Sequence, residues 1–197
     1  MQKLIGMQYK KIKRIFDLIL AIIFSLFFFV PFCIIAVAVK FSSVGPVIFW
    51  SDRVGCNNSI FKMPKFRTML ISTPVVATHM ISQPEKYLTP IGSFLRKSSL
   101  DEIPQLWNIL KGEMSFVGPR PALYNQYDLI SKRAKININQ LLPGITGWAQ
   151  INGRDELSIN KKIKLDHFYL KHQSFWFDCK ILFLTCLRIL SRHGISH

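Results

Sequence analysis

The spacing of hydrophobic residues separates an apolar N-terminal stretch from a mixed region that follows it. Residues 18–39 carry no charged side chain over 22 positions, and a helix of that length can cross a bilayer. After residue 40 the apolar positions become short runs separated by turns and polar side chains. This pattern predicts two parts: a basic N-terminus with a membrane segment at residues 1–40, and a globular domain at residues 41–197.

The apolar stretch contains a proline, and both of its flanks are basic. Pro31 removes a backbone hydrogen bond and kinks a helix. Because basic flanks favour the cytoplasmic side, a re-entrant helix–break–helix that enters and leaves through one leaflet fits both features. A single spanning helix is an equal alternative on pattern alone. The basic residues of the two flanks are Lys3, Lys10, Lys11, Lys13, Arg14, Lys40, Arg53, Lys62, Lys65 and Arg67.

The mixed region predicts an α/β domain that is mostly helical and contains a small β-hairpin. Pro46–Trp50 and Ile60–Met63 have the composition of short strands joined by a turn. Apolar residues recur at helical spacing from Leu100 to Leu110, and Tyr124–Lys135 is a second amphipathic segment. Pro143–Gly147 is expected to be a loop.

The last apolar segment, Phe175–Leu190, is amphipathic and begins with three aromatic residues. A helix of this kind can lie flat at a lipid interface. It can equally be an ordinary core helix, and periodicity does not separate the two alternatives.

Charge and hydropathy together indicate a membrane surface. The net charge is +15 and the isoelectric point is about 9.9, yet 49% of the residues are hydrophobic and the mean hydropathy is +0.23. A basic and apolar chain favours a surface of anionic lipids, and its charge also suits an anionic substrate. We therefore expect anionic membrane lipids as partners and no nucleic acid.

Two adjacent carboxylates, Asp101 and Glu102, stand at the start of the predicted helix 100–110. Ser99 and Glu102 have the spacing of a capping box, which gives Glu102 a structural explanation. At 100° per residue Asp101 points away from the apolar stripe, so the capping box leaves it without a structural role. We expect Asp101 to face solvent or a cleft, with its ionised form favoured by the helix N-terminus, as a nucleophile or metal ligand requires.

Basic residues accompany this pair along the chain. Arg96 precedes Asp101 by five residues, and Arg120 stands between two prolines that make its turn rigid. An arginine held in this way suits phosphate oxygens. Together these residues have the composition of a Mg²⁺-diphosphate site in which Asp101 and Glu102 hold the ion. Further basic candidates for phosphate binding are Lys65, Arg67 and Arg154.

The order of these motifs resembles the bacterial sugar transferase family, the small monotopic phosphoglycosyl transferases. The resemblance covers nearly the whole chain, and so many motifs in one order make it specific. The similar segments are Lys65–Met69, Leu95–Arg96, Ser99–Leu106, Lys111–Ser115, Val117–Pro121, Pro143–Arg154 and Asp166–Tyr169.

The resemblance implies an enzyme that transfers a sugar 1-phosphate from a UDP-sugar to undecaprenyl phosphate and so initiates polysaccharide or glycoconjugate synthesis. Asp101 matches the family nucleophile, which attacks the β-phosphate, releases UMP and carries the phosphosugar covalently. Glu102 matches the second carboxylate, which is tied to Mg²⁺. Lys65, Arg96 and Arg120 would bind phosphate and nucleotide.

The resemblance also favours one interpretation of the apolar stretch. It implies a re-entrant segment broken at Pro31, with both ends on the cytoplasmic face of the bacterial inner membrane. The protein is then monotopic, with amphipathic helices at the interface and a catalytic domain at residues 41–197. Some relatives have serine before the proline at the break, where this chain has Val30.

The sugar and two rival functions stay open at this point. Residues 122–126 and 70–88 resemble members that act on N-acetylated amino or deoxyamino sugars. A glycosyltransferase that cleaves the glycosidic bond would release UDP instead of UMP. A non-enzymatic basic membrane module would tolerate Asp101→Asn. The sequence also leaves open the role of Glu102 and the oligomeric state, for which a homodimer is one option.

Overall fold

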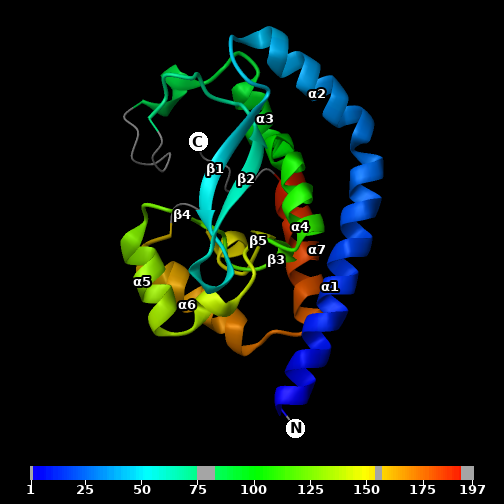
Figure 1. The fold of residues 1–197 in the computed structure, drawn as a ribbon, viewed down its shortest axis with the longest axis vertical. Coiled ribbons are helices and arrows are strands. Elements are labelled where there is room, and N and C mark those ends of the chain that lie inside the picture. Colours follow the sequence, from blue (N-terminus) through cyan, green and yellow to red (C-terminus); the bar gives the residue numbers. More distant parts are fainter. Residues whose placement is uncertain (1, 75–82, 154–156, 192–197) are drawn as a thin grey trace.

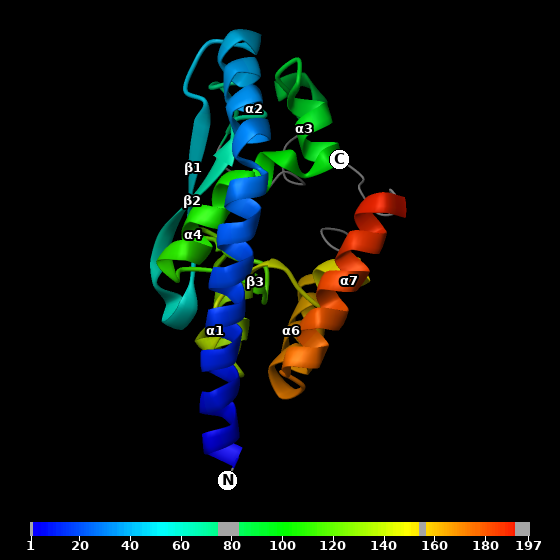
Figure 2. The same ribbon diagram turned by 90° about the vertical axis from the view of Figure 1, so that its right-hand side faces the viewer.

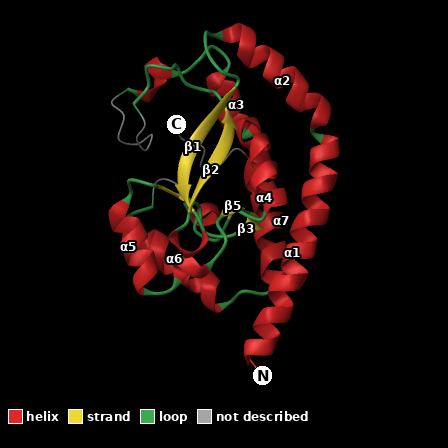
Figure 3. Ribbon diagram, viewed as in Figure 1, coloured by secondary structure: helices red, strands yellow, loops and turns green. Residues whose placement is uncertain are grey.

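Most of the chain is helical, and small sheets lie among the helices. In a computed structural model of the chain, residues 2–74, 83–153 and 157–191 are described. Figure 1 shows the longest helices along one side of the molecule, and Figure 3 shows how little of it is strand. The predicted fold class, mostly helical α/β with a small β-hairpin, is confirmed.

The described elements alternate between helices and short strands. Neither α3 nor α6 is among the elements expected from the sequence. The α-helices are α1 (Gln2–Phe27), α2 (Phe29–Ser42), α3 (Gly92–Ser98), α4 (Leu106–Lys111), α5 (Tyr127–Lys135), α6 (Ile159–Lys171) and α7 (Phe175–Ser191). The 3₁₀ helices are η1 (Cys56–Asn58), η3 (Pro84–Tyr87), η4 (Leu100–Gln105), η5 (Ile138–Gln140) and η6 (Gln150–Asn152). The strands are β1 (Ile48–Val54), β2 (Ile60–Phe66), β3 (Ser115–Val117), β4 (Ala122–Leu123) and β5 (Gly144–Thr146).

The apolar N-terminal stretch forms two helices with a sharp bend between them. α1 and α2 meet at Phe28, where the chain bends by 60°. Pro31 is in the first turn of α2. It has no N–H to donate to the carbonyl of Phe27, and its ring crowds that carbonyl. The break therefore falls three residues before the proline that causes it.

The bent pair of α1 and α2 runs along one side of the domain (Figure 2). One face of the pair packs on the domain, and many of its other apolar side chains are exposed. Within the described residues, no single helix is long and apolar enough to span a membrane. The two helical segments of residues 8–42 together have the length and composition of a membrane segment, with a bend between them. Ala21, Ile35 and Val39 are buried against the domain. The exposed apolar side chains of the pair include Ile19, Ile22, Ile23, Leu26, Phe27, Phe29, Val30, Ile34, Val37 and Phe41.

β1 and β2 form the predicted hairpin, but β1 begins two residues later and both strands end later than predicted. They pair antiparallel from Ile48 opposite Phe66 to Val54 opposite Ile60. β4 adds to the other edge of β1, so the sheet order is β2-β1-β4. β2 is the strand that carries Lys65 toward the helices.

The second sheet is a parallel pair of β3 and β5, and it corrects the expectation that residues 143–147 form a loop. Gly118 follows β3, and Gly144 begins β5. A Cβ atom on Gly144 would lie 2.2 Å from the amide nitrogen of Gly118. The glycines that suggest a loop in the sequence therefore permit a backbone approach that no side chain allows.

The core lies between α1, α4, α7 and the strands. Burial of these side chains is the main favourable contribution to the fold. A smaller cluster of Ile35, Val39, Phe66 and Leu95 joins α2 to the end of β2 and to α3. The main cluster comprises Ala21, Phe61, Met63, Leu106, Ile109, Met114, Phe116, Val117, Ile151, Tyr169 and Ile181.

α7 corresponds to the predicted C-terminal amphipathic helix. Ile181 on α7 is fully buried, whereas 79% of Trp176 and 63% of Phe183 are exposed. The helix packs on β3 and β5 with one face and leaves an aromatic face outside. Contact of this face with lipid stays a prediction.

A buried ion pair joins α1 to α7. Asp178 lies 2.6 Å from Lys13 Nζ and accepts hydrogen bonds from the hydroxyls of Tyr9 and Tyr169 at 2.8 and 2.7 Å. Burial raises the pKa of both tyrosines, so their hydroxyls stay protonated and act as donors. These contacts join the N-terminal part of the chain, residues 1–40, to the domain that follows it. The boundary at residue 40 stays a prediction.

Two further polar side chains of α1 bind backbone groups of the domain. The Arg14 guanidinium donates to the carbonyls of Ile109 and Leu110, in the last turn of α4, at 2.5 and 2.9 Å. Asp17 accepts from the N–H of Phe116 at 3.1 Å. α1 is therefore positioned by specific polar bonds as well as by apolar packing.

We predict that Asp178→Ala destabilises the protein strongly. The substitution leaves the largely buried ammonium of Lys13 unpaired and takes the acceptor from two tyrosine hydroxyls, which costs about 3 kcal/mol. For a chain of this size that corresponds to a fall in Tm of roughly 10 °C. Thermal unfolding in detergent micelles measures it. The matched control is Asp52→Ala, which removes an exposed ion pair with Lys62 and should change stability by less than about 0.5 kcal/mol. Equal Tm values for the two variants would contradict the assignment.

Candidate active site

The segment that carries Asp101 and Glu102 is a 3₁₀ helix rather than the start of an α-helix. Ser99, between α3 and η4, takes a left-handed conformation with φ 57°. Pro104 lies inside η4, where it has no N–H to donate, and α4 begins only after η4 ends. The Ser99 side chain makes no capping hydrogen bond, so the capping box expected from the sequence is not formed.

Asp101 is buried, so of the two expected positions, in solvent or in a cleft, the solvent-facing one is wrong. Only 7% of the residue is exposed. Residues three apart eclipse one another in a 3₁₀ helix, so Asp101 shares the face of Pro104, and η4 packs on β2. Burial is the main influence on the Asp101 carboxyl and raises its pKa above the ordinary 3.8, although the charge of Lys65 acts in the opposite direction. Burial therefore acts against the ionised form that the sequence analysis expected to be favoured, and Lys65 acts for it.

Glu102 lies between two cations. Its Oε1 atom is 2.6 Å from Lys65 Nζ and 3.4 Å from Arg120 Nη2. The same Lys65 nitrogen is 3.9 Å from Asp101 Oδ2. The side chains of Lys65 and Glu102 are only 16% and 11% exposed, a depth at which charge pairs interact more strongly than at the surface. β2, η4 and the turn after β3 therefore bring four of the predicted site residues together.

Arg96 completes the basic surroundings of Asp101. It comes from α3, and the left-handed turn at Ser99 brings α3 back beside η4. Its Nε atom donates to Thr68 Oγ1 at 3.1 Å, and its Nη2 atom lies 3.0 Å from Met69 Sδ. Burial raises the pKa of Asp101, and the charge of Arg96 is one of the influences that lower it. This places the guanidinium within electrostatic reach of the carboxylate.

Arg67 has a different position from the one predicted. It is 4% exposed and donates to the backbone carbonyls of Val39, Ser43 and Val44 at the end of α2. The guanidinium therefore binds the carbonyls at the C-terminus of α2, and these bonds occupy it in the free protein. Arg154, another predicted phosphate ligand, lies outside the described residues.

An ion pair that was not predicted from the sequence supports the turn that carries Arg120. Arg133 on α5 donates to Asp166 on α6 at 3.1 and 2.7 Å, and to the carbonyl of Arg120 at 2.9 Å. The two charged residues are 33 positions apart, and nothing local in either segment predicts that they meet. They could be recognised only once α5 and α6 were known to be adjacent.

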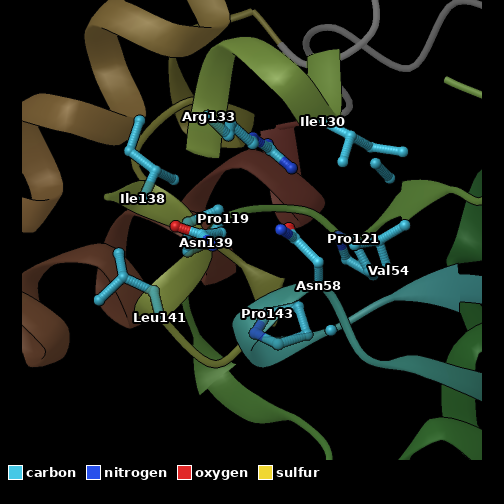
Figure 4. A pocket seen from close by; sticks show the side chains of 12 residues that line it. Val54, Asn58, Pro119, Pro121, Ile130, Arg133, Ile138, Asn139, Leu141 and Pro143 are labelled. Carbon is cyan, nitrogen blue, oxygen red and sulfur yellow. The ribbon is translucent and has the colours of Figure 1, made fainter. Parts of the chain in front are cut away.

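A small pocket of about 30 Å³ lies beside the same turn (Figure 4). Arg133 lines it together with Pro119 and Pro121, the two prolines that flank Arg120, and with Asn58 of the β-hairpin turn. A larger cavity of about 240 Å³ lies against α1 and is lined by Lys10, Lys13 and Arg14 among others. Asp101 and Glu102 line neither of these two cavities.

The carboxylate pair fits Mg²⁺ only in company with a phosphate substrate. Among the described residues, no three histidine, cysteine or acidic side chains gather into a metal site. Asp101 and Glu102 are two adjacent carboxylates, and Mg²⁺ is usually held by one or two carboxylates with substrate phosphates and water in the remaining positions. A diphosphate would complete the ligand set.

The arrangement suits nucleophilic attack on phosphorus. A carboxylate can form a covalent intermediate with a phosphoryl group. Lys65, Arg96 and Arg120 supply fixed positive charge around it, which can stabilise negative charge that develops on phosphate oxygens.

The sequence is similar to known proteins over most of its length. Residues 8–192 match the family model described as bacterial sugar transferase. The chain is 41% identical over 185 residues to the UDP-glucose:undecaprenyl-phosphate glucose-1-phosphate transferase of Escherichia coli (strain K12), covering 90% of this chain and 40% of the relative. It is 41% identical over 187 residues to the uncharacterized sugar transferase EpsL of Bacillus subtilis (strain 168), covering 94% of this chain and 90% of the relative.

A third relative is named for a different sugar. The UDP-N-acetylgalactosamine-undecaprenyl-phosphate N-acetylgalactosaminephosphotransferase of Aeromonas hydrophila is 35% identical over 191 residues, covering 94% of this chain and 45% of the relative. The chain thus spans less than half the length of the two relatives that are named for a sugar nucleotide, and most of the length of EpsL.

We predict that Asp101→Asn raises the thermal stability of the protein at neutral pH. Because the folded-state pKa of Asp101 lies above its ordinary value of 3.8, the folded protein binds the proton of this carboxyl more tightly than the unfolded chain does. The stability that this carboxyl contributes is complete below pH 3.8 and is lost as the pH rises through the raised value.

The gain in Tm for Asp101→Asn should therefore grow from about pH 4 to about pH 7, as measured by thermal unfolding across that range. Asp128→Asn, at an exposed carboxylate on α5, is the control and should show no comparable gain. A lower Tm for Asp101→Asn at neutral pH would mean that the attraction of Lys65 outweighs burial.

Proposed function

We infer that this chain, which belongs to the bacterial sugar transferase family, transfers a sugar 1-phosphate from a UDP-sugar to undecaprenyl phosphate. The observation that carries the proposal is the buried carboxylate of Asp101 with Glu102 beside it and with Lys65, Arg96 and Arg120 around it. The E. coli and Aeromonas relatives bear names for this kind of transfer.

In the first step that we propose, the carboxylate of Asp101 attacks the β-phosphorus of the UDP-sugar. A bond forms between the carboxylate oxygen and phosphorus, and the bond from phosphorus to the bridging oxygen breaks, so that UMP leaves with the electron pair. The sugar 1-phosphate remains on Asp101 as an acyl phosphate. Lys65 and Arg120, which pair with Glu102 in the free protein, would bind the diphosphate oxygens.

In the second step, a phosphate oxygen of undecaprenyl phosphate attacks the same phosphorus. The acyl-phosphate bond breaks, the carboxylate of Asp101 is restored, and a polyprenyl diphosphate sugar is the product. Two steps on one nucleophile allow one site to serve a soluble donor and a lipid acceptor in turn. Glu102 lies next to the nucleophile, where it can assist the acceptor or hold the metal.

Asp101 and Glu102 would hold Mg²⁺ together with the diphosphate. When bound, the ion neutralises diphosphate charge and assists departure of UMP. The basic side chains around the pair suit the same substrate, because they would exchange their contacts with Glu102 for contacts with diphosphate oxygens when the metal and the donor bind.

The sugar that we propose is an N-acetylated amino or deoxyamino sugar. The support is the resemblance of residues 122–126 to members with such donors, and the Aeromonas relative is named for N-acetylgalactosamine. The E. coli relative is named for glucose instead. The donor therefore has to be tested across both classes.

We also propose that the protein is monotopic at the cytoplasmic face of the bacterial inner membrane. The bent pair of α1 and α2 has an uncovered apolar face, and basic residues flank it on both sides. Positive flanks favour the cytoplasm, and anionic lipids would attract them further. α7, with its exposed aromatic face, would lie at the same interface.

The reaction is tested with purified protein, undecaprenyl phosphate, Mg²⁺ and separate UDP-sugars, including N-acetylated and non-acetylated ones. We expect UMP release with at least one donor and loss of this release when the metal is chelated. Asp101→Asn should lower the rate by at least about a thousandfold, because the amide is not a nucleophile of this kind. Release of UDP would indicate glycosidic cleavage, and full activity in Asp101→Asn would remove the proposed nucleophile. Asp52→Asn, at an exposed carboxylate of β1, is the matched control.

The membrane arrangement is tested with single cysteines placed on either side of the bent pair. In a variant whose four cysteines are replaced by alanine, Lys10→Cys and Lys62→Cys introduce the labels at exposed positions. A re-entrant pair predicts that a membrane-impermeant maleimide reaches neither cysteine in intact cells and both after permeabilisation. Labelling of just one of them in intact cells would instead indicate a spanning helix.

A further inference from the structure

The ion pair of Arg133 and Asp166 holds one specific backbone group of the site. The Arg133 guanidinium uses Nε and Nη2 for Asp166 Oδ2, at 3.1 and 2.7 Å, and Nη1 for the carbonyl of Arg120, at 2.9 Å. The side chains of Arg133 and Asp166 are 11% and 2% exposed. Two bonds to the carboxylate orient the guanidinium, and the remaining bond is aimed at the Arg120 turn.

The Arg120 carbonyl is a group on which the direction of the turn depends. Because Pro121 has no N–H, this carbonyl is the only polar group of its peptide unit. The carbonyls on either side have their own donors: the Gly144 N–H donates to Pro119 at 3.0 Å, and Arg53 donates to Pro121 at 3.3 Å. Arg133 therefore supplies the bond at the centre of the turn.

The position of this turn determines that the Arg120 side chain lies beside the carboxylates. Arg120 Nη2 is 3.4 Å from Glu102 Oε1, and its charge is among those that act on Asp101, whose pKa burial raises. The Arg120 side chain is long and 32% exposed. The range of positions open to its guanidinium therefore depends on how firmly the backbone is held. A fixed backbone lowers the entropy lost when the guanidinium binds phosphate.

Lysine cannot perform this function at position 133. A lysine ammonium is a single point of charge without the planar fork that reaches a carboxylate and a carbonyl in fixed directions. An ion pair serving stability alone has no need of a bond to Arg120, and buried ion pairs contribute little to stability compared with apolar residues of similar size. The third bond therefore indicates a function beyond stability.

We propose that Arg133, oriented by Asp166, is a positioning residue that aims Arg120 at the diphosphate of the UDP-sugar. The inference rests on the proposed function, because it assigns the donor's phosphates as the target of Arg120. Arg133 itself touches neither the carboxylate pair nor, in this assignment, the substrate. Its effect on the reaction passes entirely through the Arg120 turn.

The test is a double-mutant cycle between Arg133 and Arg120. Arg133→Lys should lower kcat/KM for the UDP-sugar about tenfold, as expected for the loss of one directed hydrogen bond. In the Arg120→Gln background the same substitution should change kcat/KM by less than about twofold, since no guanidinium is left to aim. Lys132→Gln, at the exposed neighbouring position on α5, is the control and should have no effect in either background.

A second pair of substitutions separates positioning from folding. Arg133→Met combined with Asp166→Leu replaces the buried pair by apolar side chains of similar size, which leaves no unpaired charge. We expect this variant to keep the Tm of the wild type within a few degrees and to show the same loss of kcat/KM as Arg133→Lys. A full kcat/KM in this well-folded variant would overturn the proposal.

Equilibrium binding of UDP gives a readout that does not depend on turnover. Arg133→Lys should weaken UDP binding about tenfold in the wild-type background and hardly at all in Arg120→Gln. Equal losses in both backgrounds would overturn the positioning role even if the wild type releases UMP. A wild type that releases no UMP but shows the coupled loss of UDP binding would contradict the proposed reaction and leave Arg133 as a positioning residue. Absence of both UMP release and UDP binding in the wild type would overturn both proposals.

Discussion

The ion pairs of Glu102 with Lys65 and Arg120 are the interaction on which the candidate site depends. They connect β2, η4 and the turn after β3 at one carboxylate. Without these cations, two adjacent carboxyl groups of low exposure would face each other in a poorly solvated place, which is costly. The pairing lets the protein keep Asp101 buried and close to positive charge. In the proposed reaction the same charges pass to the phosphate groups of the donor.

The rest of the fold holds these elements in position. Gly118 and Gly144 allow β3 and β5 to pair, so that the Arg120 turn starts from a fixed strand. Arg14 and Asp17 bind α1 to α4 and β3. The helix that continues into the apolar stretch is therefore bonded directly to the elements next to the site. In the proposed reaction, which takes one substrate from solution and one from lipid, this connection would fix the depth of the site.

Several features could be predicted from the sequence because they depend on local chemistry. The β-hairpin, α5, α7 and the break near Pro31 follow from alternation, helical spacing and the missing N–H of proline. Other predictions were wrong because backbone conformation and contacts between distant segments decided the outcome. The 3₁₀ turn at Leu100–Gln105 replaces the expected α-helix because Ser99 is left-handed and Pro104 cannot donate. Arg67 serves α2, which is distant in sequence, and β5 forms where two glycines suggested a loop.

The sequence by itself determined the kind of chemistry and the residues available for it. A basic and apolar chain, an Asp101–Glu102 pair, an arginine between prolines and a proline in an apolar run are all visible in the printed letters. The tertiary structure alone decided which of these residues meet. The burial of Asp101 follows from the geometry of η4 on β2, and the bond from Arg133 to the Arg120 carbonyl follows from the packing of α5 against α6. Contacts between distant segments depend on how the core closes, and local spacing carries no record of that.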